Sequence, residues 1–425
     1  MSLLDHRVSR TATTHVPESG LLRSPLLVWG VLFLNGLTFS DLPTLVPIPT
    51  VVGQLITQGA LVVALLLALL ANPSVIVRPS LFLVLLTILG VVALMVSIHN
   101  EFILGSTYRA CRLIGFIVVL WLLTPWWGRS DLVLLRAHIT CLRILVVTIL
   151  AGALLAPAAA FSYGGRLSGA LWPIPPTQVG HYAAVLLGCT AVLWFGGAVR
   201  GRTALLTLLV AGSALIGAHT RTALLGLIIG LAFAGASMFM GHPRVRRTSA
   251  LLGVIAVLGA TLFAPLIVSW LRRGQTAEDA AQLTGRTKVW TALLGTNRSR
   301  MEELFGSGLS NQSFDGLSID SNWLADYLDQ GWFGVFIDAA LVLILIVLAV
   351  FHRRGIRRAN ALFLVTYCVV ASITETGLGE ASPYTLDLVV AASLLAAPIS
   401  RGSLGESFKR EPDTILRPPP RTEVG

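Results

Sequence analysis

Three arginines sit in short polar segments whose composition suits a phosphate site. Arg166 lies in Gly-Gly-Arg-Leu-Ser-Gly, Arg221 in His-Thr-Arg-Thr-Ala-Leu-Leu-Gly and Arg286 in Thr-Gly-Arg-Thr-Lys-Val-Trp. A guanidinium is permanently charged and donates paired hydrogen bonds to phosphate oxygens, so three that converge would bind a diphosphate. Taken singly, each arginine has a simpler explanation, because it could reach to lipid phosphates or pair with a nearby acid.

Acidic residues in later polar segments could complete such a site. Asp320 is the candidate catalytic base, since a carboxylate near arginines can accept the proton of an attacking hydroxyl. Its structural alternative is the N-cap of the helix that follows, and both roles can hold together. Asp326 and Asp329, three residues apart, are expected on the solvated face of that helix. Glu375 could pair with one of the arginines or contribute to an acceptor site.

The segments that must position these residues are strongly apolar. The chain has 425 residues, of which 55% are hydrophobic and 12% charged, with a mean hydropathy of +0.78. A soluble domain cannot bury that much apolar surface, so we expect an all-α polytopic membrane protein. Apolar windows long enough to span a bilayer predict about twelve transmembrane helices. They cover residues 25–39, 52–71, 79–98, 111–127, 131–156, 179–197, 203–218, 222–240, 249–270, 333–351, 359–374 and 383–399.

The distribution of positive charge predicts an orientation. With a cytosolic amino terminus, twenty of the 31 Lys and Arg residues fall on the inner side, as short cytosolic loops prefer. The expected organisation is a cytosolic tail (1–24), nine spans (25–270), an extracytoplasmic loop with short helices (271–332), three spans (333–399) and a disordered cytosolic tail (400–425). Within the loop, Ser299 and Glu302 form a capping-box pattern that predicts a short surface helix. The three arginines then lie on the outer side.

Other functional classes lack their signatures. The net charge of +10 is explained by cytosolic turns that contact anionic membrane lipid, and no nucleic-acid-binding module is visible. The four cysteines fall in predicted spans without metal-ligand or redox spacing, so no metal site is expected. The sequence has no Walker-type phosphate loop, no HExxH and no GxSxG, and no cofactor is expected.

The order of these motifs resembles the O-antigen ligase and O-antigen polymerase family over about residues 166–334. Leu-Phe-Gly-Ser-Gly-Leu-Ser-Asn at 304–311 is similar to that family's glycine-containing turn, and residues 320–334 resemble its loop-closing helix. In the ligases this helix opens with His, then Asn, Ser or Gln, then nine residues and Gly. Here Ser321 and Gly331 keep the spacing, and Asp320 occupies the His position.

The resemblance implies a membrane glycosyltransferase of the cytoplasmic (inner) membrane. Its donor would be a polyprenyl-diphosphate-linked oligosaccharide held by Arg166, Arg221 and Arg286, and its acceptor a glycan or glycolipid hydroxyl at the outer face. The reaction would invert the sugar without a metal ion. The departure at Asp320 favours a polymerase or a more distant relative, and peptidoglycan-polymerising membrane glycosyltransferases would look similar. The competing class is a transporter or flippase of the same lipid-linked oligosaccharide.

Overall fold

The structure, a computed structural model, describes residues 24–37, 39–40, 42–99, 103–239, 246, 261–272, 286–310, 312–314 and 316–398. The predicted tails, apart from residue 24, lie outside the described residues. The same holds for residues 249–260 of the ninth predicted span. The described residues do not test the predictions for those segments.

Long helices coincide with every predicted span except the ninth. They are α1 (Pro25–Gly36), α2 (Thr50–Ala71), α3 (Leu81–Ser97), α4 (Ile103–Leu122), α5 (Val133–Leu155), α7 (Pro176–Phe195), α8 (Gly201–Ala218), α9 (Arg221–Phe239), α15 (Asn322–Phe351), α16 (Ile356–Ala371) and α17 (Pro383–Leu395). Short helices connect them: η2 (Thr124–Trp126), α6 (Pro157–Ala160), α11 (Ala264–Arg272), α13 (Arg286–Gly295) and α14 (Arg300–Phe305). The all-helical expectation misses a hairpin of β1 (Ser313–Phe314) and β2 (Leu317–Ser318), in which Ser313 pairs with Ser318.

Among the described helices, 7 are long and apolar enough to cross a membrane: α2, α4, α5, α7, α8, α9 and α15. Helices α1, α3 and α17 are apolar but shorter. This is the architecture of a helical membrane protein. The number of twelve spans stays a prediction.

Helix α2 shows how the bundle is built for lipid. It packs against α1 and α4. The residues that it buries are small and recur every three or four positions: Gly53, Thr57, Ala60, Ala64 and Ala68. Large apolar side chains such as Leu55, Val62 and Leu66 are exposed. Small residues let helix backbones approach closely, while lipid solvates the large ones, so this pattern is typical of a transmembrane helix.

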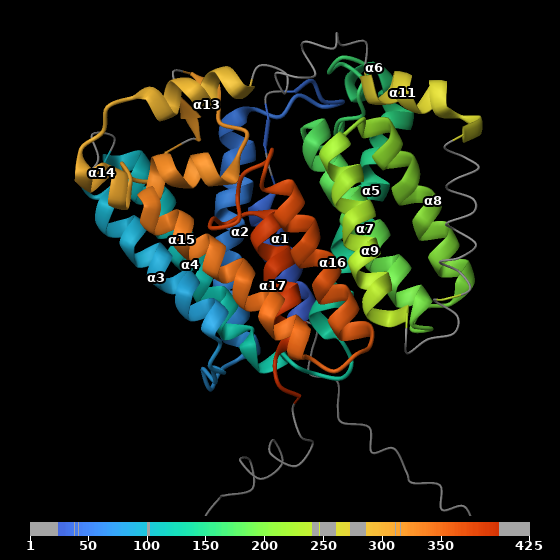
Figure 1. The fold of residues 1–425 in the computed structure, drawn as a ribbon, viewed down its shortest axis with the longest axis horizontal. Coiled ribbons are helices and arrows are strands. Elements are labelled where there is room, and N and C mark those ends of the chain that lie inside the picture. Colours follow the sequence, from blue (N-terminus) through green and yellow to red (C-terminus); the bar gives the residue numbers. More distant parts are fainter. Residues whose placement is uncertain are drawn as a thin grey trace, which may run out of the picture.

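Four of the short connecting helices lie at one end of the bundle (Figure 1). Helices α7, α8 and α9 form one side, and α3, α4 and α15 form the other, with α1, α16 and α17 between them. Helices α6, α11, α13 and α14 all lie at the same end. The segment predicted as a polar loop therefore shares this end with the Arg166 loop, which follows α6.

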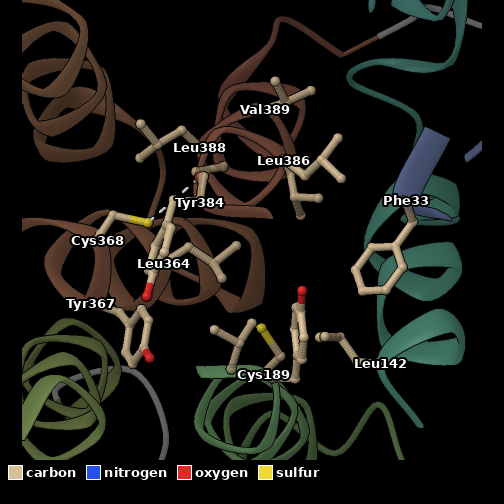
Figure 2. Packing of buried hydrophobic residues seen from close by; sticks show 14 of the residues in the cluster. Phe33, Leu142, Cys189, Leu364, Tyr367, Cys368, Tyr384, Leu386, Leu388 and Val389 are labelled. Atoms are coloured by element: carbon tan, nitrogen blue, oxygen red, sulfur yellow. Dashed lines mark hydrogen bonds between the residues drawn. The ribbon is translucent and has the colours of Figure 1, made fainter. Parts of the chain in front are cut away.

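Helix α17 lies at the centre of the bundle. Every residue of this helix from Pro383 to Leu395 is buried. It packs on α16, and Figure 2 shows the Cys368 thiol of α16 directed at the Tyr384 carbonyl, 3.7 Å away. Helix α17 is one of the shorter apolar helices, and protein encloses it completely.

Two glycines hold the loop helices against the bundle. Helix α14 begins with the predicted capping box, which is confirmed, because Ser299 and Glu302 each accept the other's backbone N–H. It ends at Gly306, which has φ 79° and contacts the backbone of Asp329. Gly331, with φ 65°, interrupts α15 one residue before the predicted boundary between loop and span. A Cβ on Gly331 would lie 2.4 Å from the Leu304 carbonyl carbon.

We predict that Gly331→Ala destabilises the protein. Left-handed backbone costs a non-glycine residue roughly 1 to 3 kcal/mol, and here the added methyl group also collides with backbone that cannot move aside freely. The measurement is thermal unfolding of the purified protein in detergent. Gly59→Ala is the matched control, because a Cβ at Gly59 meets nothing within 4 Å. Equal unfolding temperatures for the two variants would contradict this account of the kink.

Candidate functional site

Arg166 is held at the corner between α8 and α9. Its loop is tied to α8 by the Leu167 N–H, which donates to the Gly217 carbonyl at 2.8 Å. The Arg166 Nε donates to the Ala218 carbonyl at 3.0 Å, at the last residue of α8. A cation at a helix carboxyl end is stabilised by the free carbonyls there. Arg166 therefore has a structural role whatever ligand it binds.

Arg221 is the first residue of α9, and the turn before it fixes its position. His219 adopts φ 49° and stacks on Trp270, with ring centroids 5.2 Å apart. Thr220 is buried and donates to the Pro176 carbonyl at 3.0 Å. Gly180 of α7 permits this approach, because a Cβ there would lie 2.6 Å from Thr220. The start of α9 is thus locked to α7.

Arg286 and Asp320 are directly paired. The Arg286 Nε lies 3.0 Å from Asp320 Oδ2, and the Ser318 hydroxyl donates to Asp320 Oδ1 at 2.6 Å. Helix α15 begins at Asn322 with Ser321 in the N-cap position, so the predicted N-cap role of Asp320 is wrong. Its carboxylate instead turns toward the first residue of α13.

The three predicted arginines share one electrostatic neighbourhood. Burial lowers the pKa of Arg166 below its usual value, and the positive charges of Arg221 and Arg286 act in the same direction. The ring of Tyr163 lies 5.8 Å from the guanidinium and, with the Glu375 carboxylate, favours the charged form. The charges of residues from three separate polar segments therefore act on one another.

Glu375 belongs to this cluster; from the sequence it could pair with one of the arginines or contribute to an acceptor site. Burial raises its pKa to about 7, and the negative charge of Asp320 acts in the same direction. The charges of Arg286 and Arg166 oppose that shift. It lies around a gap too small to hold a water molecule, together with Thr177, Thr220, Thr222, Ala223, Tyr367, Ala371 and Tyr384. A carboxyl group with a perturbed pKa beside arginines is a mark of a functional site.

The predicted solvated face of Asp326 and Asp329 is wrong, since their exposed fractions are only 4% and 2%. The first turns of α15 pack against α14, which removes that face from solvent. Asp329 Oδ2 accepts the Ser310 backbone N–H at 3.0 Å. The Asn322 amide donates to both Asp326 and Asp338. Asp329 therefore ties the loop before β1 to α15, and Asp326 and Asp338 join the two parts of α15 through Asn322.

A second ionisable group lies deep in the bundle and was not predicted. Asp387 of α17 lies 2.8 Å from His138 Nε2 of α5 and 3.4 Å from His181 Nε2 of α7. The His138 contact has the length of an ion pair without the alignment of a hydrogen bond. Each of the three side chains is at most 2% exposed. Ionisable residues inside otherwise apolar windows were the signal that could have identified them.

The fold and the site define a helical membrane protein with an arginine and carboxylate cluster at one end of its bundle. No protein-family model matches the chain, and no curated protein matches it significantly. Chemically, the cluster can bind an anion through guanidinium groups and place a titratable carboxyl group beside it.

We predict that Asp387→Ala strongly destabilises the bundle. Removing Asp387 leaves His138 and His181 buried without this polar partner, and a buried polar group left unsatisfied costs about 1 to 3 kcal/mol. Thermal unfolding in detergent measures the effect. Asp131→Ala is the control, since the Arg129–Asp131 pair is 44% and 39% exposed and such pairs contribute about 0 to 1 kcal/mol. A loss for Asp387→Ala no larger than the control's would refute the buried Asp387–histidine contact as a stabilising interaction.

Proposed function

We propose that this protein is a membrane glycosyltransferase of the O-antigen ligase or polymerase type. It would transfer a glycan from a polyprenyl-diphosphate-linked donor to a hydroxyl of an acceptor glycan or glycolipid. The observation that carries the proposal is the shared neighbourhood of Arg166, Arg221 and Arg286. They come from three separate polar segments, and these same segments carry the resemblance to the family.

The arginines would act on the leaving group. As the bond between the sugar and the diphosphate breaks, negative charge grows on the diphosphate oxygens. Guanidinium groups already in place stabilise that charge more than they stabilise the ground state. Because the arginines supply the positive charge, the proposed reaction needs no metal ion or nucleotide. Attack from the face opposite the diphosphate would invert the anomeric centre.

The membrane location follows from the same arrangement. A polyprenyl chain partitions into lipid, so its diphosphate lies at the membrane surface, where the loop after α6 and the first residues of α9 and α13 carry the arginines. The excess of Lys and Arg predicted for the opposite face assigns this end to the extracytoplasmic side of the cytoplasmic membrane, with both termini in the cytosol.

The predicted catalytic role of Asp320 is weakened by its contacts. Both of its carboxylate oxygens are engaged, one by Arg286 and one by Ser318. Asp320 is better suited to orienting Arg286 toward the diphosphate.

A transporter or flippase of the same lipid-linked oligosaccharide is the second candidate. The observation in its favour is Asp387 between His138 and His181, since buried ionisable groups within spans are typical of proton-coupled carriers. Against it, the arginines lie at one end of the bundle, whereas carriers place their substrate site near the midplane.

We predict that Arg221→Ala abolishes most turnover. The assay supplies purified protein with lipid-linked oligosaccharide and acceptor and follows the release of free polyprenyl diphosphate. Loss of one charge-stabilising donor reduces turnover about 100- to 1,000-fold. Arg129→Ala is the control, because Arg129 is an exposed arginine paired with Asp131 away from the cluster. Equal release by the two variants would exclude the arginine cluster as the donor site.

A second experiment separates the enzyme from the transporter. Protein is reconstituted in vesicles with lipid-linked oligosaccharide, and each leaflet is sampled for intact donor, free polyprenyl diphosphate and lengthened or transferred glycan. We expect transfer products and no accelerated crossing of intact donor. Crossing of intact donor without cleavage would identify a flippase and refute the enzyme.

A further inference from the structure

We infer that Glu375 is the general base of the proposed reaction, taking the proton of the acceptor hydroxyl as that hydroxyl attacks the donor sugar. This inference rests on the proposed function. It assigns to Glu375 the role that sequence patterns had suggested for Asp320.

The end of α16 holds Glu375 against the start of α9. The Glu375 N–H donates to the Ala371 carbonyl at 2.9 Å, so the residue extends the last turn of α16. The preceding residue, Thr374, has its hydroxyl 2.7 Å from that of Thr222, which directly follows Arg221 in α9. This contact holds the Glu375 segment against the start of α9. The carboxyl group is thus carried to the arginines by a packed helix rather than by a free loop.

The two carboxylates differ in their contacts. Asp320 is paired with Arg286 at 3.0 Å and accepts a hydrogen bond from Ser318. Glu375 interacts with the charges of Arg286 and Arg166, which only partly offset the effect of its burial. Asp320 is therefore engaged by its neighbours, and Glu375 is the acid left to serve a substrate hydroxyl.

The proton affinity of Glu375 suits a base. A general base works best when its pKa lies near the operating pH, and burial raises the pKa of Glu375 to about 7. The carboxylate can therefore take a proton from a sugar hydroxyl during attack and release it to water between turnovers.

The reaction balances with these groups. The acceptor O–H bond breaks, its proton goes to the Glu375 carboxylate, and its oxygen forms a bond to the anomeric carbon. The bond between that carbon and the diphosphate oxygen breaks, and the diphosphate leaves with the electron pair beside the arginines. Polyprenyl diphosphate departs, and Glu375 returns its proton to solvent.

The test compares pH profiles of turnover for Glu375→Gln, Glu375→Asp and Asp320→Asn. In the native protein we expect the rate to rise as pH increases through about 7, because the base must be ionised. Glu375→Gln keeps the shape of the side chain but cannot accept a proton, so turnover should fall about 100- to 10,000-fold and the pH-dependent rise should disappear. Glu375→Asp should restore part of the rate. Asp320→Asn should weaken donor binding through Arg286 and keep the rise.

Binding of the lipid-linked donor, measured separately, checks that each variant is folded. We expect Glu375→Gln to bind the donor about as tightly as the native protein. If the native protein turns over and Arg221→Ala does not, but Glu375→Gln keeps the pH-dependent rise, Glu375 is not the base and the proposed function stands. If the native protein releases no polyprenyl diphosphate under any condition, the proposed function itself fails.

Discussion

Permanently charged guanidinium groups that gather in a partly buried place repel one another, and the site depends on the anions that offset this repulsion. Asp320 supplies one, through its contact with Arg286. Glu375 supplies a second that is ionised only in part near neutral pH. The free site therefore retains an excess of positive charge, which is the condition for attracting a diphosphate from the membrane surface. The loops around the cluster keep these charges at fixed separations.

Contacts to backbone atoms, more than side-chain packing, hold these loops in place. Arg166 is tied to the end of α8, Thr220 to the start of α7, and the α14 turn to the kink of α15 through two glycines. Each contact joins a polar loop to a helix that is anchored by the apolar bundle. Rigid helices thereby position groups from sequence segments far apart in the chain, and the precision of the site comes from the bundle.

Much of the helical architecture could be predicted because membrane helices are long apolar runs ended by polar residues. The convergence of Arg166, Arg221 and Arg286 on one diphosphate stays a prediction, and the interaction of the Arg166 charge with the other two agrees with it. The surroundings of individual acids could not be predicted. The burial of Asp326 depends on α14 folding back over α15, and the partner of Asp320 is set by where α13 begins. The pairing of Asp387 with His138 joins helices far apart in the sequence, which no local pattern reveals.

The enclosed position of α17 has a consequence for how the protein is made. Asp387 of this helix contacts His138 of α5 and His181 of α7, and α17 is translated long after those two helices. These contacts can form only after α17 has been made. Assembly of the centre is therefore completed late, when α17 packs among helices that were synthesised before it.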